Sequence, residues 1–335
     1  MRVLLTGAGG SVGIMTLKAL LEDDHQVTVF DLLNLKNKRR LSPYLNKVNV
    51  IWGDISDQAI LDKIVKDQEV IIHLAAIIPP KADIYPDLAE KVNYLGTLNL
   101  IQAIKKQSVP PYLIFASSIS VYGDRIENYW ITVNDELKAS VNDHYAKLKI
   151  LTEAKIKEAN IDHVIIRLTA IMDRPKIDPL MFHMPLRTKM EIATSKDTGY
   201  AFAQMLKYLN TLNNNIYNLG GGKHCRVEYE VFLRKMLDIY GFDTSILYPL
   251  CFATQNFHCG YYLDGDILND ILDFQRDKIE DYYQSVEDQT SFIIKIINRL
   301  LGGFILAHMQ KNAHPYQALK NNDREAIRRF FGGAR

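Results

Sequence analysis

The feature that most constrains the fold is the glycine-rich segment TGAGGSVG at residues 6–13. It follows a short apolar run, Val3–Thr6, and precedes a stretch with helical spacing, Ser11–Leu21. Glycines spaced in this way after a strand permit a tight turn, a close approach of backbone to a diphosphate, and packing of helix on strand. The helix N-terminus then offers free N–H groups to an anion. The segment predicts a dinucleotide-binding turn, with a glycine turn that holds no ligand as the alternative. The predicted contacts are Gly7, Gly10, Ser11, Val12 and Gly13.

Short apolar runs alternate with longer helical stretches through the first half of the chain. The predicted strands are Val3–Thr6, Gln26–Asp31, Val48–Trp52, Val70–Leu74, Tyr112–Ala116 and His163–Leu168. The predicted helices are Ser11–Leu21, Gln58–Lys66, Leu88–Lys106 and Tyr145–Ala159. Strands alternating with helices indicate a parallel sheet covered on both faces. We therefore expect an α/β chain with a Rossmann-type doubly wound parallel sheet.

The pattern changes after Leu168. Residues 173–185 contain three prolines and read as loop with short elements, whereas Thr198–Asn210 and Ile216–Leu219 resemble the earlier helix–strand units. Further helices are expected at Val227–Tyr240 and Asp323–Phe331. We assign residues 1–170 to a nucleotide-binding domain that the chain re-enters at about 196–220. Residues 171–195 and 221–335 form a smaller, mixed substrate lobe and a C-terminal tail.

Composition excludes several classes of protein. The 40 Lys and Arg residues nearly balance the 39 Asp and Glu residues, so the formal net charge of +1 gives no electrostatic signature for nucleic acid or an anionic membrane. Cys225, Cys251 and Cys259 have neither metal-ligand nor redox-motif spacing, which is typical of reduced thiols in a cytoplasmic protein without a metal site.

The most apolar stretch is Phe292–Leu306. Lys295, Arg299 and a Gly-Gly pair interrupt it, and no stretch approaches the ~18–20 apolar residues of a membrane-spanning helix. The N-terminal apolar run is too short for a signal peptide. We expect Phe292–Leu306 to form a packing or interface helix rather than a membrane-surface helix, and we expect no membrane partner.

Several residues at predicted strand ends are candidates for cofactor contacts. Asp31 lies about 20 residues beyond the glycines, where a carboxylate accepts hydrogen bonds from ribose hydroxyls and repels a 2′-phosphate. It favours NAD over NADP, unless it merely caps a turn. Arg39 and Arg40 would serve NADP, but a solvated basic corner is the simpler interpretation. The remaining candidates follow the third and fourth strands: Asp54, Ile55, Leu74, Ala75 and Ala76. His73 is interpreted as a structural residue.

Tyr145 and Lys149 are four residues apart in a segment rich in helix formers, so they share one helical face. An ammonium close to a phenol favours the phenolate and lowers the pKa of the tyrosine from about 10. Such a tyrosine can exchange a proton with an alcohol as hydride leaves its carbon. The spacing alone is common by chance and depends on its surroundings.

The segment FASSISVYG, residues 115–123, supplies those surroundings. It leaves a strand about 25 residues before Tyr145, and a hydroxyl at a strand end can hold the oxygen of a substrate beside the tyrosine. Ser118 is the candidate, with Ser117 and Ser120 as alternatives or turn residues.

Taken together, these motifs resemble the extended short-chain dehydrogenase/reductase family, in its NAD-dependent epimerase/dehydratase group. The matching segments are TGAGGSVG, Asp31, GDI at 53–55, HLAA at 73–76, VNYLGTLNL at 92–100, FASSISVYG, YAKLK at 145–149, Arg167-Leu168, TGYAFAQML at 198–206 and NIYNLGGG at 215–222. They cover about residues 1–240. The resemblance implies catalytic roles for Ser118, Tyr145 and Lys149, cofactor contacts from Tyr145, Lys149 and Asn93, and a homodimer that pairs through helices including the one that carries Tyr145.

The sequence also departs from this family. Dehydratase members carry Asp-Glu just after the catalytic Ser or Thr, where this chain has Ile119 and Ser120, which disfavours sugar 4,6-dehydration. Nucleotide-sugar epimerases of this family usually carry a long insertion after the strand that ends near Arg167. Here only about 30 residues separate Arg167 from the helix at Thr198, which puts a UDP-sugar substrate in doubt. Candidate substrate contacts are Ser118, Tyr122, His183 and Arg187, although packing for His183 and an exposed loop position for Arg187 are the simpler interpretations.

Two functions therefore remain open. One is an NAD-dependent oxidoreductase or epimerase acting on a secondary alcohol or keto group, such as that of a sugar or nucleotide sugar. The other is a non-enzymatic NAD(H)-binding regulator with the same fold, because fold alone does not establish an activity.

Overall fold

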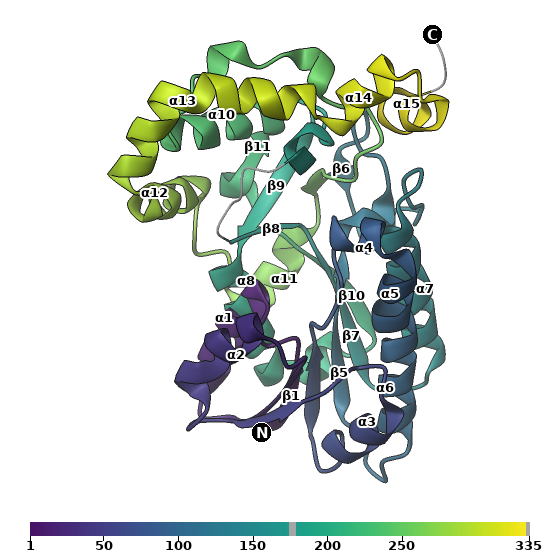
Figure 1. Cartoon of the computed structure of the whole chain (residues 1–335). Coiled ribbons are helices and arrows are strands. Elements are labelled where there is room, and N and C mark those ends of the chain that lie inside the picture. Colours follow the sequence, from purple (N-terminus) through teal and green to yellow (C-terminus); the bar gives the residue numbers. More distant parts are fainter. Residues whose placement is uncertain (174–178, 333–335) are drawn as a thin grey trace.

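The computed structural model describes residues 1–173 and 179–332, which form a larger lobe built on a parallel sheet and a smaller lobe at the carboxyl edge of that sheet (Figure 1). Residues 174–178, within the predicted loop after Leu168, lie outside the described residues.

The large sheet has seven parallel strands in the order β10-β7-β5-β4-β1-β2-β3. Its strands are β1 (Arg2–Thr6), β2 (Gln26–Asp31), β3 (Asn49–Trp52), β4 (Val70–His73), β5 (Tyr112–Ser118), β7 (His163–Leu168) and β10 (Asn215–Leu219). The chain runs outward in both directions from β1, which is doubly wound topology and confirms the predicted fold class. Continuous Val, Ile and Leu runs form these strands because both faces are buried.

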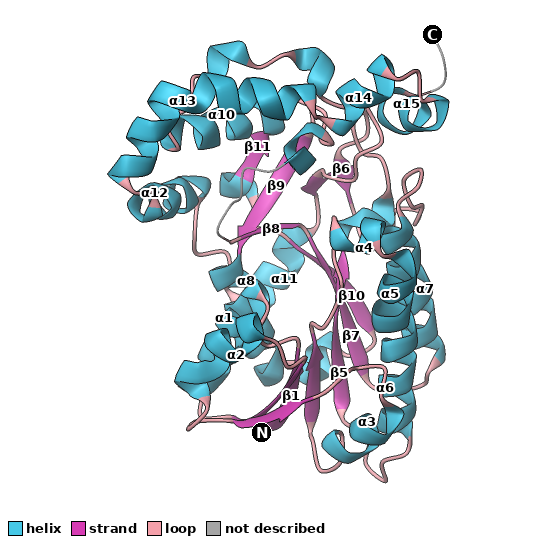
Figure 2. Cartoon of the chain, viewed as in Figure 1, coloured by secondary structure: helices cyan, strands magenta, loops and turns pink. Residues whose placement is uncertain are grey.

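Alternate strand residues enter two separate cores. Val3, Leu5 and Ile72 pack against one group of helices, and Leu4 and Ile71 pack against the other. The helices on the first side are α1 (Ser11–Glu22), α2 (Leu35–Leu41), α8 (Ser195–Gln204), α9 (Leu209–Leu212) and α11 (Gly265–Leu272). Those on the second side are α3 (Gln58–Ile64), α4 (Lys81–Ile84), α5 (Pro86–Ala89), α6 (Gly96–Lys105) and α7 (His144–Glu158). Figure 2 shows the two groups on either side of the strands.

Three predicted helices differ in detail from the structure. Thr198–Asn210 corresponds to the end of α8, a 3-10 segment at Met205–Lys207 and the start of α9. The predicted helix Leu88–Lys106 is divided into α5, a π-helical segment Glu90–Leu95 and α6. The predicted start at Val227 is wrong, because β11 (Arg226–Glu228) pairs with a neighbouring strand before α10 (Tyr229–Ile239) begins. These are local differences that leave the order of the main elements unchanged.

The smaller lobe contains a mixed three-stranded sheet, β11-β9-β8, with β8 (Ala170–Met172) parallel and β11 antiparallel to β9 (Lys189–Thr194). A second small sheet joins β6 (Trp130–Ile131) to β12 (Tyr261–Tyr262). The core under α10 and α12 (Ile279–Gln289) includes Phe182, Phe232 and Leu237. After β9 the chain returns to the large sheet, where α8 packs against α1 and β10 pairs with β7, and it returns again at α11, which packs against β10.

The tail forms three helices, α13 (Phe292–Lys311), α14 (His314–Lys320) and α15 (Arg324–Phe331). One expectation from the sequence needs correction. By length and composition, α13 alone among the described helices is long and apolar enough to cross a membrane, with a mean hydropathy of 1.5 over an 18-residue window that is only 11% buried. The sequence interpretation treated Lys295, Arg299 and the Gly-Gly pair as interruptions, but the helix continues through them and on to Lys311.

Candidate active site

The carboxyl ends of β1, β2, β4 and β5 meet at one edge of the sheet, and the candidate site is built there. At the end of β1 the chain turns at Gly7, whose φ of +72° lies in the left-handed region. A Cβ on Gly7 would lie 2.6 Å from the backbone nitrogen of Ala75, and one on Gly13 would lie 2.3 Å from the carbonyl oxygen of Gly7. The turn therefore requires glycine at both positions. Ser11 and Val12 form the first turn of α1, and the N-cap, Gly10, has no side chain to fill the helix N-terminus.

Asp31, at the end of β2, is held against this turn. Its carboxylate accepts hydrogen bonds from the backbone N–H of Gly9 at 2.7 Å and from the Asn37 amide at 2.8 Å. Burial raises the pKa of the Asp31 carboxyl, and this effect outweighs the hydrogen bonds that lower it. Arg40 also reaches the turn, donating from Nη1 to the Gly9 carbonyl at 3.0 Å. The sequence interpretation of Arg40 as a solvated corner is therefore wrong, since α2 carries its guanidinium back to the glycines.

Asp173 is a residue of the site that sequence reasoning missed. It follows β8, 162 residues beyond Ser11, and accepts a hydrogen bond from the Ser11 hydroxyl at 2.5 Å. Its carboxylate also lies 3.7 Å from Arg40 Nη2. No sequence signal places this loop residue beside the glycine turn, because the contact arises from tertiary folding.

Residues at and just after the end of β4 pack against the end of β1 and the glycine turn. Thr6 Oγ1 lies 2.7 Å from His73 Nδ1, and His73 Nε2 lies 3.0 Å from Thr97 Oγ1. Complete burial, with a smaller effect from Lys149, lowers the pKa of His73 to about 3, which fits the structural role predicted for it. Half-buried Leu74, Ala75 and Ala76 follow, with Leu74 and Ala75 directly against Gly7.

Asn93 holds the segment that follows Ala76. Its side chain accepts from the Ile77 N–H at 2.7 Å and donates to the Ile77 carbonyl at 2.8 Å. Asn93 is buried, so the structure gives it a bracing contact with the backbone of this segment.

Asp54 and Ile55, the candidates after β3, differ in character. Asp54 accepts from the N–H and hydroxyl of Ser56, and Lys91 lies 3.9 Å away. Burial opposes ionisation, but these contacts prevail and lower the pKa of Asp54. Ile55 is buried, in contact range of Gly96 on α6. Only Asp54 retains substantial exposure at the sheet edge.

The structure brings Ser118, Tyr145 and Lys149 together. Ser118 ends β5, Tyr145 lies in the first turn of α7, and Lys149 lies one turn later. The Ser118 hydroxyl lies close enough to the Tyr145 phenol to act on its pKa. Lys149 Nζ donates to the Ala116 carbonyl at 2.6 Å and lies 5.8 Å from the centre of the Tyr145 ring. The three side chains therefore line one place between β5 and α7.

The pKa of Tyr145 differs from the sequence expectation. Burial raises it above its ordinary value, against the opposing effect of the nearby Ser118 hydroxyl. The expected lowering by Lys149 is absent in this state because the ammonium is directed to the Ala116 carbonyl and over the Phe115 ring at 4.5 Å. Burial also lowers the pKa of Lys149 to about 8, and the carboxylate of Glu153 partly offsets this change.

The three neighbouring serines have different environments. Ser118 is half-buried, and its Oγ accepts from the Ser120 N–H as the cap of a short 3-10 helix, Ile119–Tyr122. The Ser117 hydroxyl donates to Glu153 in the interior at 2.5 Å. The hydroxyl of Ser120 is buried without a partner among the described residues. Of the three, Ser118 is the one that reaches Tyr145.

A buried polar network lies beneath these residues. Arg167 on β7 makes two hydrogen bonds to the Glu153 carboxylate, at 2.7 and 3.1 Å. Arg167 Nη1 also donates to the Tyr122 hydroxyl at 2.8 Å, which in turn donates to Asn218 Oδ1 at 2.7 Å. Glu153 lies four residues after Lys149 on the same face of α7, and this spacing is the sequence signal that was overlooked.

The other candidate substrate contacts, Tyr122, His183 and Arg187, have partners away from the Ser118–Tyr145 pair. The hydroxyl of Tyr122 is committed to this interior network, and burial raises its pKa to about 12. His183 Nε2 lies 2.9 Å from His314 Nδ1, and its ring also packs against Phe330 of α15. Arg187 pairs at 2.7 Å with Glu127, and both side chains are exposed. The described part of the chain shows no contact between His183 or Arg187 and the Ser118–Tyr145 pair.

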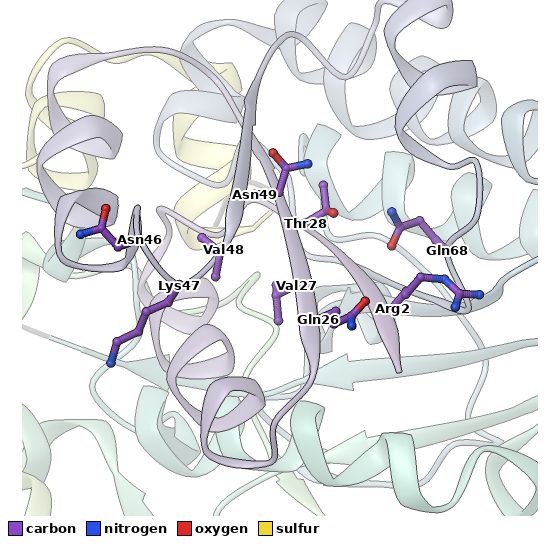
Figure 3. A pocket seen from close by; sticks show the side chains of 9 residues that line it. All are labelled: Arg2, Gln26, Val27, Thr28, Asn46, Lys47, Val48, Asn49 and Gln68. Carbon is purple, nitrogen blue, oxygen red and sulfur yellow. The ribbon is translucent and has the colours of Figure 1, made fainter.

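A surface hollow of about 500 Å³ lies elsewhere (Figure 3). It is lined by Arg2, Gln26, Val27, Thr28, Asn46, Lys47, Val48, Asn49 and Gln68. These residues lie at the amino ends of β1, β2 and β3, the sheet edge opposite Ser118 and Asp31. Ligands of doubly wound sheets bind at the carboxyl edge, so this hollow is not the candidate active site.

Several known proteins are similar to this chain in sequence. The model of the 3-beta hydroxysteroid dehydrogenase/isomerase family matches residues 4–176. A putative UDP-glucose 4-epimerase of Methanocaldococcus jannaschii is 30% identical over 245 residues, which is 67% of this chain and 78% of that protein. A D-erythronate dehydrogenase of Haemophilus influenzae is 26% identical over 181 residues, 52% of this chain and 56% of that protein. The chain thus spans only about half the length of this second relative.

Solved structures share the fold at lower identity. A dTDP-glucose 4,6-dehydratase from Streptomyces venezuelae, solved with NAD bound, superposes with a TM-score of 0.71 and 22% identity, covering 85% of this chain and 96% of that chain. The similarity extends over both lobes, so the small lobe is part of the shared architecture.

Proposed function

Because the chain belongs to the extended short-chain dehydrogenase/reductase family, in the group that joins 3-beta hydroxysteroid dehydrogenases with NAD-dependent epimerases and dehydratases, we propose that it is an NAD-dependent oxidoreductase or epimerase acting on a secondary alcohol or keto group of a sugar-like substrate. The observation that carries the proposal is the meeting of Ser118, Tyr145 and Lys149 at the sheet edge that holds the glycine turn and Asp31.

The residues at this edge fit NAD. The glycine turn leaves no room for a Cβ at Gly7 or Gly13, and the N-terminus of α1 is open to a diphosphate. Asp31 would accept hydrogen bonds from the adenosine ribose, and its negative charge disfavours the 2′-phosphate of NADP. Arg40 is held on Gly9 and is the nearby cation that would moderate this preference. Bound NAD would supply the hydride acceptor and donor.

The proposed roles of the reaction residues follow from their chemistry. Tyr145 takes the hydroxyl proton of an alcohol when the carbon is oxidised, and it returns the proton to a ketone in reverse. Ser118 holds the substrate oxygen beside that phenol. Lys149 must give up its bond to the Ala116 carbonyl and face Tyr145 to favour the phenolate. In an epimerisation, the same residues would act twice on opposite faces of one carbon.

The environment of residues 119 and 120 argues against a sugar 4,6-dehydratase. Such an enzyme needs an acid and a base after the serine position, and here Ile119 and Ser120 offer no carboxylate. Both side chains are buried. We therefore favour net oxidation, reduction or epimerisation without elimination of water.

A non-enzymatic NAD(H)-binding regulator is less well supported. Such a protein needs the glycine turn and Asp31 but has no need of a tyrosine, a lysine and a serine gathered beside them. The relatives described above are named as enzymes.

The test compares the wild-type chain with Tyr145→Phe. We expect the variant to lose at least about 100-fold in turnover, because the proton-transfer group is gone. NAD affinity, measured by calorimetry, should stay within a few-fold, because the phenyl ring is retained. Mass spectrometry of co-purified small molecules and a screen of nucleotide sugars and hydroxy acids would supply the substrate for the assay.

Phe substitution at Tyr44, a half-buried tyrosine of the first lobe away from Ser118, serves as the matched control. Undiminished turnover in Tyr145→Phe would overturn the mechanism. A wild-type chain that binds NAD and shows no turnover over the whole screen would instead favour the regulator.

A further inference from the structure

The outward face of α13 is apolar, which is the reverse of an ordinary surface helix. Phe292, Leu300 and Phe304 have exposed fractions of 74%, 74% and 80%. The same helix exposes Ile293, Ile294, Ile296, Ile297, Leu301 and Ile305. Next to its C-terminal half, Tyr248 and Leu250 are also exposed. A contiguous apolar surface of this kind marks an interaction site.

Two amide side chains of α13, those of Asn298 and Gln310, face inward instead. Asn298 donates to the Tyr240 carbonyl at 2.8 Å, and Gln310 donates to the Ile246 carbonyl at 3.0 Å and accepts from the Tyr248 N–H. Gly302 and Leu306 are buried against the lobe. The helix is therefore fixed to the protein along its length, and it would have to break these bonds in order to cross a bilayer.

Charge sets this end of the chain apart. Residues 291–335 contain eight Lys or Arg residues and two Asp or Glu residues, whereas the rest of the chain contains 32 and 37. The formal charges are thus +6 and −5. α13 itself carries Lys295, Arg299 and Lys311 and no acidic residue. Among the described residues, Lys295 alone of these three has an acidic partner, Glu287 of the acidic helix α12.

The position of α13 suits a broad, flat partner. In Figure 1, α13, α14 and α15 follow one another along the end of the small lobe that faces away from the N-terminus and the large sheet. α14 and α15 add exposed Lys320 and Arg328 to this end of the molecule. A partner surface that contacts the end of the molecule formed by α13, α14 and α15 therefore contacts apolar and cationic side chains at the same time.

We propose that α13 docks on an anionic lipid surface, lying in the headgroup region with its apolar face inward and its cations at the level of the phosphates. Interfacial helices combine such a face with flanking Lys and Arg residues. A second copy of the chain fits less well, because a twofold interface places the same patch against itself. Arg299 and Lys311 would then meet cations without acidic partners.

The test measures co-sedimentation of the full chain with two kinds of vesicle, phosphatidylcholine alone and phosphatidylcholine mixed with phosphatidylserine. We expect binding to the mixed vesicles and at least about tenfold weaker binding to the neutral ones. The variant L300E/F304E should lose at least about tenfold in binding to the mixed vesicles. The variant R299Q/K311Q should lose a similar factor on mixed vesicles and little on neutral ones.

Val109→Glu is the matched control, because Val109 is also highly exposed but precedes β5 at the amino edge of the large sheet. It should bind vesicles as the wild type does. Circular dichroism melts establish that each variant is folded, and sedimentation equilibrium without lipid reports the oligomeric state. Absence of wild-type binding to the mixed vesicles overturns the proposal. If L300E/F304E then also converts a dimer to a monomer, the face belongs to a second copy.

Discussion

Arg167 and Glu153 form a salt bridge in which each side chain is at most 2% exposed. An uncompensated charge in the interior is costly, so each of these two charges needs the other. Hydrogen bonds from Ser117 to Glu153 and from Arg167 to Tyr122 add to the compensation. The pair joins α7, which carries Tyr145 and Lys149, to β7 of the sheet. The geometry of the reaction residues therefore rests on an interaction that touches no substrate.

Glu153→Gln leaves the Arg167 guanidinium buried without a counter-charge. We expect the free energy of unfolding, measured by urea titration, to fall by about 3–5 kcal/mol. Glu158→Gln is the control, since Glu158 lies on the same helix and forms a surface ion pair with exposed Lys155. It should leave stability within experimental error. Equal stabilities for the two variants would show that the buried pair stabilises the fold no more than the exposed pair does.

At the residue scale, the sequence predicts best where chemistry and local geometry coincide. Gly7 and Asp31 lie where a strand–turn–helix unit requires them, and neighbours in sequence largely determine their positions. Asp173 and the inward position of the Tyr122 hydroxyl depend on segments more than 90 residues apart. The pKa of Tyr145 was expected to fall and rises instead, because burial and the direction of one ammonium decide it.

At the scale of elements, α15 bridges the two lobes. Arg329 lies 3.8 Å from Asp83 on α4 of the larger lobe. In the smaller lobe, the backbone N–H of Thr254 donates to the Phe330 carbonyl, and Phe330 is buried. Asn142, three residues before Tyr145, contacts Glu325. The last helix therefore holds the small lobe against the segment that leads into α7.

Arg329→Glu should loosen this bridge, because it sets a carboxylate against Asp83. We expect a several-fold rise in the KM for substrate, while the Kd for NAD is unchanged because the glycine turn is remote from α15. Arg328→Glu makes the same change at an exposed neighbour without an acidic partner among the described residues. A similar KM for both variants would show that α15 is not part of the bridge.

The large sheet was predictable because each of its strands is a short apolar run between helical stretches, so local pattern and global position agree. The β11 strand was not, since its three residues form a strand only through pairing with β9. The charges and glycines of α13 suggested an interrupted segment, yet the helix continues through Lys295, Arg299 and the Gly-Gly pair without a break.

At the scale of the whole molecule, stability should depend on pH through Lys149. Its pKa in the folded chain is about 8, against an ordinary value of 10.5, so between these values the unfolded chain binds a proton that the native state has lost. The free energy of unfolding then rises with pH. From pH 8 to about 9.5, the wild type should gain roughly 1–2 kcal/mol relative to Lys149→Met. Parallel curves for the two proteins would contradict the lowered pKa.

Averages over the whole chain conceal its most unusual region. The net charge of +1 suggested no charged partner, yet it is the sum of an acidic body and a basic tail. Only the structure shows that the tail is folded, that it occupies one end of the molecule, and that its apolar residues point outward. The sequence is enough to count the charges of the body and of the tail. The exposure of the apolar residues of the tail is known only from the tertiary structure.

The position of β10 has a consequence for how the chain is made. The sheet is complete only when residues 215–219 pair with β7, and the segment between them contributes β8 and β9 to the other lobe. A growing chain therefore carries an unpaired edge at β7 for about 50 residues of synthesis, and such edges recruit other strands. A fragment cut at the apparent boundary near residue 170 would keep that edge permanently and should aggregate, so any dissection of this protein has to extend past β10.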